Sequence, residues 1–179
     1  MSIQYIEGIQ NQVDQNMMIK YLRSVLAAEL IRAHTYYTES KVVQGVYTEE
    51  IQKMLSDQLE EERGHIAMII SRILQLGGNP EIDPMDWNKH TPCKYVHHTA
   101  WDEETILENA LAGEKCVQQA YTKIAEFAKD RDVTSHHVLL KILDTEMEGI
   151  RLITQMLETV RGDDVRKERE EAKAKSKDK

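Results

Sequence analysis

Residues 59–73 of the chain read LEEERGHIAMIISRI, and this stretch decides the fold class. Apolar side chains recur in it at steps of three and four residues, which is the period of an amphipathic α-helix. Glu62 and His65 lie on the same apolar stripe, one helical turn apart. The stretch therefore predicts a helix that carries a carboxylate and an imidazole on the face that it buries.

The composition predicts that most of the chain is helical. Of its 179 residues 41% are hydrophobic, and 3 Pro and 8 Gly are too few for the turns of a β-sandwich or barrel. The formal net charge of −8 disfavours binding to nucleic acid or to an anionic membrane. With 2 Cys, no signal-peptide pattern and no apolar run of membrane length, we expect a cytoplasmic protein.

Four long helices are expected, at residues 13–44, 48–76, 102–129 and 133–161. Glycine follows the end of the first, second and fourth of these segments, as it commonly does after a helix. Loops of about three residues join the first helix to the second and the third to the fourth, so each pair is expected to be antiparallel. Residues 79–101 hold all 3 prolines and are long enough to cross the length of a bundle.

These features predict an all-α fold, a ferritin-like four-helix bundle of two antiparallel helical hairpins joined by a long crossover. We expect the bundle to occupy residues 1–162. Residues 163–179 hold 7 Lys or Arg and 6 Asp or Glu without an apolar pattern, so we expect a charged, disordered tail there.

Each of the four expected helices has one glutamate on its apolar stripe, close to the middle of the helix. These residues are Glu29, Glu62, Glu114 and Glu146. Buried together without compensation, each carboxylate would cost about 5 kcal/mol, and the four would repel one another. Protons or divalent cations would remove that cost, and carboxylates combined with one or two imidazoles suit iron or manganese. With His65 as the imidazole, the pattern predicts a metal centre between the helices.

The glutamates also repeat along the chain. The first and third lie 85 residues apart, and the second and fourth lie 84 residues apart. Tyr36 and Tyr121 each follow a glutamate by seven residues, or two helical turns, and so share its face. We therefore expect two related hairpins around the centre. The two tyrosines are expected to donate hydrogen bonds to the ligands, to scavenge radicals, or simply to pack.

With these residues the chain resembles the ferritin-like superfamily of di-iron carboxylate proteins, over roughly residues 14–161. That family has a Glu on the first and third helices and Glu-x-x-His on the second and fourth. The resemblance implies a di-iron site, with manganese or zinc as other possible metals. Its ligands and catalytic residues would be Glu29, Glu62, His65, Glu114 and Glu146. Gly149 stands where the family has its second His, so one metal position is expected to be weaker or to be completed by water.

A narrower resemblance concerns the two cysteines. A linker cysteine, Cys93, and the run Gly113-Glu114-Lys115-Cys116 are similar to Dps-like ferritins with a cysteine pair, called thioferritins. The resemblance implies that Cys93 and Cys116 lie close together near the metal site as a redox pair. The alternatives are a loop thiol and a small core residue. It also implies a homo-oligomeric shell of twelve chains that oxidises Fe(II) with H2O2 or O2 and stores or detoxifies the iron.

Two alternative functions stay open. One is another di-metal enzyme on the same bundle, such as a manganese catalase or a peroxidase. The other is a DNA-protecting shell with a degenerate metal site, suggested by Gly149 and by four lysines within residues 172–179. Six further histidines are candidates to replace the missing ligand, although such residues more often lie at the surface: His34, His90, His97, His98, His136 and His137.

Overall fold

The computed structural model describes residues 2–80, 82–98 and 100–177, with all of their side chains except those of residues 2–13, 164, 165 and 167–177. Its elements are α1 (Ser2–Val42), α2 (Thr48–Gln75), the 3-10 turn η1 (Pro84–Asp86), α3 (Trp87–His90), α4 (Glu103–Ala128) and α5 (Val133–Lys177). Extended pairing in the described part is limited to one bridge, between Gln44 and Asp102. The predicted all-α class is confirmed.

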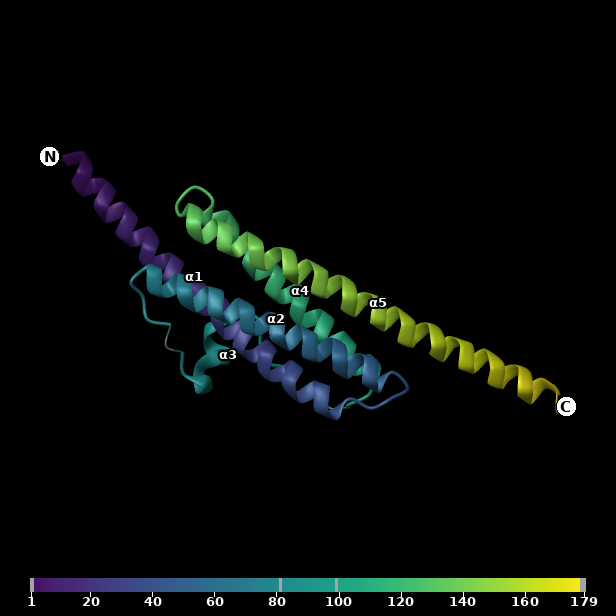
Figure 1. Cartoon of the computed structure of the whole chain (residues 1–179). Coiled ribbons are helices and arrows are strands. Elements are labelled where there is room, and N and C mark those ends of the chain that lie inside the picture. The colour runs from purple at the N-terminus through teal and green to yellow at the C-terminus, as the bar shows by residue number, and fades with distance from the viewer. Residues whose placement is uncertain (1, 81, 99, 178–179) are drawn as a thin grey trace.

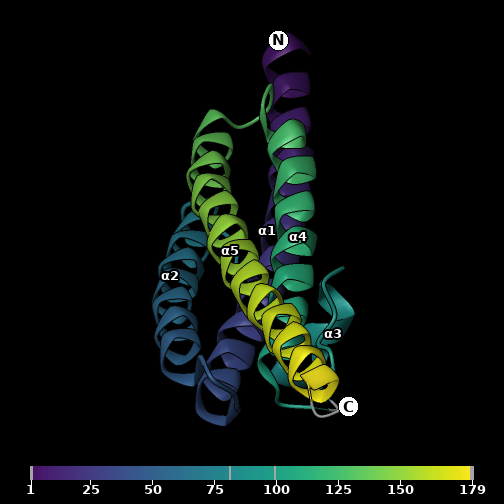
Figure 2. The same ribbon diagram turned by 90° about the vertical axis from the view of Figure 1, so that its right-hand side faces the viewer.

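The long helices form two antiparallel hairpins that lie side by side. α1 packs along α2 and α4 packs along α5, and contacts of α1 with α4 and of α2 with α5 close the bundle (Figures 1 and 2). The crossover between the hairpins carries α3, which contacts α1. Gly77, with φ of 70°, turns the chain out of α2 in the left-handed region that glycine tolerates best. The predicted bundle of two hairpins with a long crossover is therefore confirmed.

The core consists of two apolar clusters with a polar layer between them. The first cluster contains Leu22, Ile73 and Leu139, and it lies near the start of α1 and the end of α2. The second cluster contains Ile51 and Ile153, and it lies near the start of α2 and the later part of α5. Along every helix the expected glutamate falls between the residues of the two clusters. The helices thus present one carboxylate each at the middle of the bundle.

Two helix ends differ from the prediction. α1 begins at Ser2, and α5 continues through Gly162 to Lys177, so that it extends beyond the rest of the bundle (Figure 1). The predicted end at Gly162 is wrong, because one glycine costs a helix only about 1 kcal/mol and good helix formers follow it. A boundary between a bundle and a separate tail stays a prediction. Residues 178–179 and the lysine side chains of residues 172–177 lie outside what the structure describes.

Among the described residues, none of the helices combines the length and the apolar character needed to cross a lipid bilayer.

Candidate metal centre

The polar layer at mid-bundle brings together four of the five residues expected to bind metal. All five are buried, with exposed fractions of 4% or less. Glu29 on α1, Glu62 and His65 on α2, and Glu146 on α5 each offer a ligand atom, and these atoms lie within 4.8 Å of one another. This group of four residues is called the carboxylate centre below. Glu114 is the predicted residue that does not join it.

His65 is oriented by two kinds of contact. Its Nδ1 lies 3.0 Å from Glu146 Oε1 and 3.5 to 3.6 Å from the nearest oxygens of the other two carboxylates. Its Nε2 lies 2.7 Å from the hydroxyl of Thr145, which itself donates to a backbone carbonyl at 2.8 Å. Because that hydroxyl proton is already used, Nε2 donates to Thr145, and Nδ1 is the atom left to face the carboxylates.

Several polar atoms of the carboxylate centre have no hydrogen-bond partner. Buried atoms without a hydrogen-bond partner are Glu29 Oε2, Glu62 Oε2, both carboxylate oxygens of Glu146, and Nδ1 of His65. Such groups are costly to bury unless something satisfies them. Carboxylate oxygens together with one imidazole nitrogen form a donor set that iron and similar divalent ions accept. The residues present therefore fit a metal ion.

Burial and the closeness of the carboxylates shift the pKa values of the centre. Burial raises the pKa of Glu146 to about 9, and burial together with the charge of Glu29 raises the pKa of Glu62 well above its usual range. Burial alone would lower the pKa of His65, but its contacts with the carboxylates outweigh burial and raise this pKa to about 12. Without a metal ion the centre holds protons instead.

Glu114 has a different environment. Its Oε1 accepts hydrogen bonds from the Tyr36 hydroxyl and from the Arg32 guanidinium, the latter at 2.5 Å. Burial alone would raise the pKa of Glu114, but the charge of Arg32 and the hydrogen bonds with Glu146, Tyr36 and Arg32 together outweigh burial and lower it. The Tyr121 hydroxyl makes the corresponding bond to Glu29 Oε1. Both tyrosines thus donate to carboxylates, while the roles of Glu114 as a ligand and of the tyrosines in the reaction stay predictions.

Sequence reasoning missed Arg32, Thr145 and Gln58. Arg32 follows Glu29 by three residues, so the same helical period places it on the buried face, but arginine usually lies at the surface. It is 5% exposed here. Gln58 is 4% exposed, and a Cβ on Gly149 would lie 2.6 Å from its Oε1. The Gln58 side chain thus fills the space beside Gly149.

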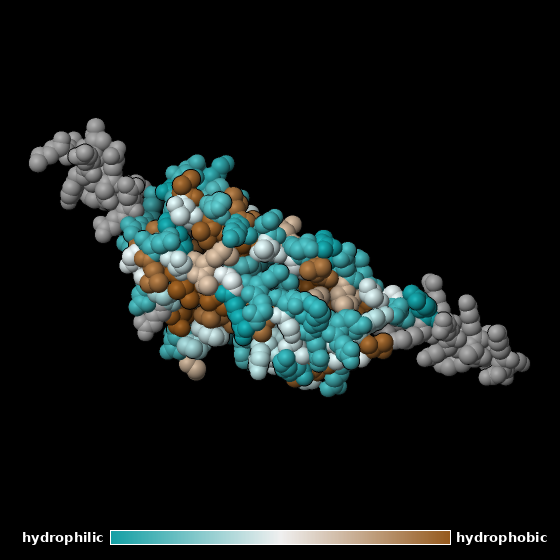
Figure 3. Space-filling view, viewed as in Figure 1, coloured by the Kyte–Doolittle hydropathy of each residue, from teal (hydrophilic) through white to brown (hydrophobic). Residues whose placement is uncertain are grey.

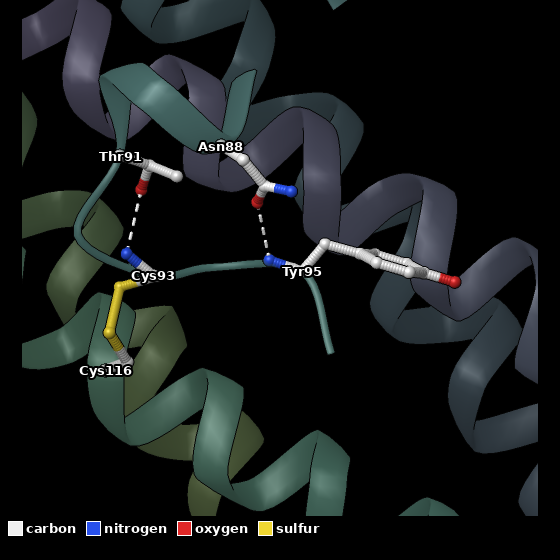
Figure 4. The surroundings of a disulfide bond; sticks show 5 residues. All are labelled: Asn88, Thr91, Cys93, Tyr95 and Cys116. Carbon is white, nitrogen blue, oxygen red and sulfur yellow. Dashed lines mark hydrogen bonds between the residues drawn. A yellow bond between two sulfur atoms is a disulfide. The ribbon is translucent and has the colours of Figure 1, made fainter. Parts of the chain in front are cut away.

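The two cysteines form a disulfide that joins the crossover to α4, with their Cα atoms 5.7 Å apart (Figure 4). Around it, the N–H of Cys93 donates to Thr91 Oγ1 at 3.1 Å, and the N–H of Tyr95 donates to Asn88 Oδ1 at 2.8 Å. The disulfide and Arg32 line one cleft of about 300 Å³. The expected closeness of the cysteine pair is confirmed, while a redox role stays a prediction.

The other candidate histidines do not join the carboxylate centre in the described part of the chain. His98 is nevertheless not the surface residue that we expected, because its side chain is 3% exposed. Its Nε2 lies 3.0 Å from Glu39 Oε1, and its Nδ1 lies 2.9 Å from Asn109 Nδ2. This histidine belongs to a separate buried pair with Glu39.

Two helical hairpins with carboxylates at mid-bundle are typical of ferritin-like proteins. Comparison of the sequence with protein-family models gives the same class. The family model of the ferritin-like domain matches residues 19–162. The chain therefore belongs to the ferritin-like family, and the resemblance found in the sequence is confirmed.

Particular relatives place the chain near the ferritins and Dps proteins. It is 26% identical over 140 residues to the DNA protection during starvation protein of Pyrococcus furiosus, covering 76% of this chain and 74% of the relative. It is 28% identical over 142 residues to a bacterial ferritin of Pseudomonas aeruginosa, covering 78% and 86%.

Solved structures agree with these relatives. A dodecameric thioferritin, the bacterioferritin-related protein of Bacteroides fragilis, matches with a TM-score of 0.82 and 28% identity, over 88% of this chain and 94% of that one. Dps from Thermosynechococcus elongatus matches with a TM-score of 0.78 and 17% identity, over 83% and 94%, which shows the fold alone. The chain is thus a ferritin/Dps-like protein in which four buried residues offer ligand atoms for a metal ion.

Proposed function

We propose that this protein binds Fe(II) at the carboxylate centre, oxidises it with H2O2 or O2, and stores or detoxifies the ferric product. The observation that carries the proposal is the set of buried, unpartnered carboxylate oxygens around Nδ1 of His65. Fe(II) is the substrate, and each ion supplies one electron, so two ions are oxidised for every H2O2 reduced to water and four for every O2. The bacterial ferritins among the relatives support this choice of cargo, whereas manganese or zinc would suit the same donor atoms.

The residues of the centre have distinct parts in the proposal. The carboxylates of Glu29, Glu62 and Glu146 supply the negative charge that draws in a divalent ion. Thr145 holds the ring of His65 so that Nδ1 faces these carboxylates, and Tyr121 holds one oxygen of Glu29. Protons carried by His65 and Glu146 leave as the ion enters, which limits the change of charge inside the bundle.

A shell provides the storage space in this proposal. The bacteroidal relative is described as dodecameric, and we propose the same assembly for this chain, within the cytoplasm. Apolar side chains at the surface support an assembly, since contiguous apolar surface marks contact sites. In Figure 3 hydrophobic surface is densest on the left half of the viewed face, and smaller patches lie on the right half. Among the side chains that the structure describes, the exposed large apolar ones are Met17, Tyr37, Val46, Leu74, Met85, Val96, Trp101, Val133, Leu140 and Met147.

The test compares Fe(II) oxidation by the wild type and by a Glu62→Ala/His65→Ala variant. Both receive Fe(II) without oxygen and then peroxide or air, and the formation of Fe(III) is followed by absorbance. We expect the variant to be slower by roughly tenfold or more, because two ligands are lost. Glu61→Ala is the matched control, since it removes an exposed carboxylate next to Glu62. Equal rates for the wild type and the double variant would refute the proposal.

The same experiment separates a catalase from a ferroxidase. A catalase releases O2 from peroxide when no Fe(II) is supplied, whereas the proposed reaction consumes Fe(II) together with the oxidant. We expect no gas evolution above the rate of the Glu62→Ala/His65→Ala variant.

A further inference from the structure

We infer that the carboxylate centre holds one divalent cation per chain and that the guanidinium of Arg32 takes the place of a second one. This inference rests on the proposed function, since it concerns how many ions the centre accepts. It departs from the di-iron pattern of the family at two positions of this chain. Arg32 and two glycines inside helices, Gly113 and Gly149, support the inference.

The first observation is that Arg32 already forms an ion pair with Glu114. Its guanidinium is permanently charged, and it donates to Glu114 Oε1 at 2.5 Å and to the Tyr36 hydroxyl. Its Nε also lies 3.8 Å from Glu62 Oε1, on the side of the carboxylate centre. Glu29, Glu62 and Glu146 each keep at least one buried oxygen without a hydrogen-bond partner, and Glu114 does not. The positive charge at this end of the polar layer therefore comes from the protein.

The second observation is that α4 leaves room for this guanidinium. Gly113 lies inside the helix, where glycine costs about 1 kcal/mol relative to alanine. A Cβ at this position would lie 2.8 Å from Cζ of Arg32, and closer still to one of its terminal nitrogens. At Gly64 and Gly162, also within helices, a Cβ would meet nothing within 4 Å. The absence of a side chain at Gly113 thus has a specific consequence, which is space for Arg32.

The third observation is that the second half of the centre has no imidazole. Glu146 is followed three residues later by Gly149, whereas Glu62 is followed three residues later by His65. The space beside Gly149 is taken by the amide of Gln58. A second cation would have to displace Arg32 from Glu114, and it would find no nitrogen ligand on α5. The like charge of the guanidinium opposes its entry as well.

The test counts cations bound by the full-length, metal-free protein. Equilibrium dialysis against Co(II) alone, followed by elemental analysis, gives the number bound per chain, and the visible Co(II) spectrum reports nitrogen and oxygen ligation. The number of Co(II) ions bound by the Glu62→Ala/His65→Ala variant is subtracted from the number bound by the wild type, so that ions at surface sites are not counted. We expect a difference of one ion. A difference of two would overturn the inference and leave the proposed function intact, whereas a difference of zero would refute the proposed function itself.

Two variants test the part of Arg32 directly. Arg32→Gln/Gly149→His removes the guanidinium and adds an imidazole, so the difference should rise to two ions. Gly149→His alone keeps the guanidinium, so the difference should stay at one. Helical circular dichroism checks that both variants fold. Two ions in Gly149→His, or one ion in a folded double variant, would overturn the inference. If either variant fails to fold, the wild-type count decides.

Discussion

Glu39 is a further buried carboxylate of α1, and it lies apart from the carboxylate centre. It is 0% exposed, and neither of its oxygens has a hydrogen-bond partner, although His98 Nε2 lies 3.0 Å from Oε1. Burial raises its pKa from the usual 4.5 to about 8, and the positive charge of Arg32 opposes this only in part. The pKa of a buried carboxyl group such as Glu39 thus depends on how closely a positive charge approaches it.

Glu39→Gln should stabilise the protein at high pH. Because the folded-state pKa of about 8 is above the usual 4.5, the stabilising effect of protonated Glu39 is fully present below pH 4.5 and is lost as the pH rises through 8. Each pH unit between 4.5 and about 8 contributes about 1.4 kcal/mol, so the variant should gain up to about 5 kcal/mol at pH 8 and little at pH 4.5.

Urea unfolding at several pH values measures this effect. Glu126→Gln is the control, since it removes an exposed carboxylate and should show no gain that grows with pH. A Glu39→Gln protein whose stability follows that of the wild type across the whole range would contradict the prediction.

At the scale of elements, the glycines within helices differ in what surrounds them. Helix propensity favours alanine at each of these positions, but the neighbouring helix decides whether a Cβ fits. Gly64 on α2 has free space around it, whereas Gly113 on α4 faces Arg32 of α1. The packing of α1 against α4 therefore reverses the preference of the isolated helix.

Gly113→Ala should destabilise the protein by about 1 to 3 kcal/mol, because the new methyl group displaces the guanidinium from Glu114. The matched Gly64→Ala should be neutral or stabilising by up to about 1 kcal/mol. Thermal unfolding of both variants measures the contrast. In a Gly113→Ala/Arg32→Ala background the steric part of the loss should disappear. Equal effects at the two glycines would show that the contact has no energetic weight.

The crossover is held to α4 by the disulfide, and Cys93→Ser should lower the free energy of unfolding. The cysteines lie 23 residues apart in sequence, and closing a loop of that length stabilises a fold by about 3 kcal/mol. Urea unfolding with and without a thiol reductant measures this. The reductant should destabilise the wild type and leave Cys93→Ser/Cys116→Ser unchanged. A wild type unaffected by full reduction would contradict the expectation.

At the scale of the whole molecule, the two hairpins protect the polar layer from both ends. Apolar clusters lie on either side of the four glutamates and their partners. Contacts between α1 and α4 and between α2 and α5 join the hairpins across this layer. The outer surface carries most of the other acidic residues and the exposed apolar side chains. Assembly and binding of other macromolecules depend on that surface.

The mass of the particle in solution tests the proposed shell. We expect about twelve times the chain mass of 20.7 kDa in multi-angle light scattering. Deleting residues 163–179 should not change the assembly if the helical bundle alone supplies the contacts. A wild-type particle with the mass of one chain would exclude storage inside a shell.

DNA binding is not expected, in spite of the name of the archaeal relative. The net charge of −8 repels the phosphate backbone, and within this total the 7 basic and 6 acidic residues of 163–179 nearly cancel. A gel-shift assay with linear duplex DNA at low salt should show no shift. A shift with the full chain that is lost without residues 163–179 would contradict this expectation.

The sequence indicated much of the fold and most of the centre because the helical period is a local property. Steps of three and four residues place Glu62 and His65 on one face whatever packs against them. The short loops and the proline-containing crossover restricted the topology to two hairpins. The end at Gly162 was wrong because a single glycine is a weak signal where helix formers follow.

The sequence by itself determined which side chains each helix buries, and so it determined that carboxylates and an imidazole meet inside a bundle. Only the tertiary structure decided how these charges pair. Arg32 reaches Glu114 across 82 residues of sequence, and Gln58 fills the space beside Gly149. Such pairings depend on the rotation and offset of helices that are distant in sequence. No local sequence pattern encodes this rotation and offset, because they result from the packing of all four helices together.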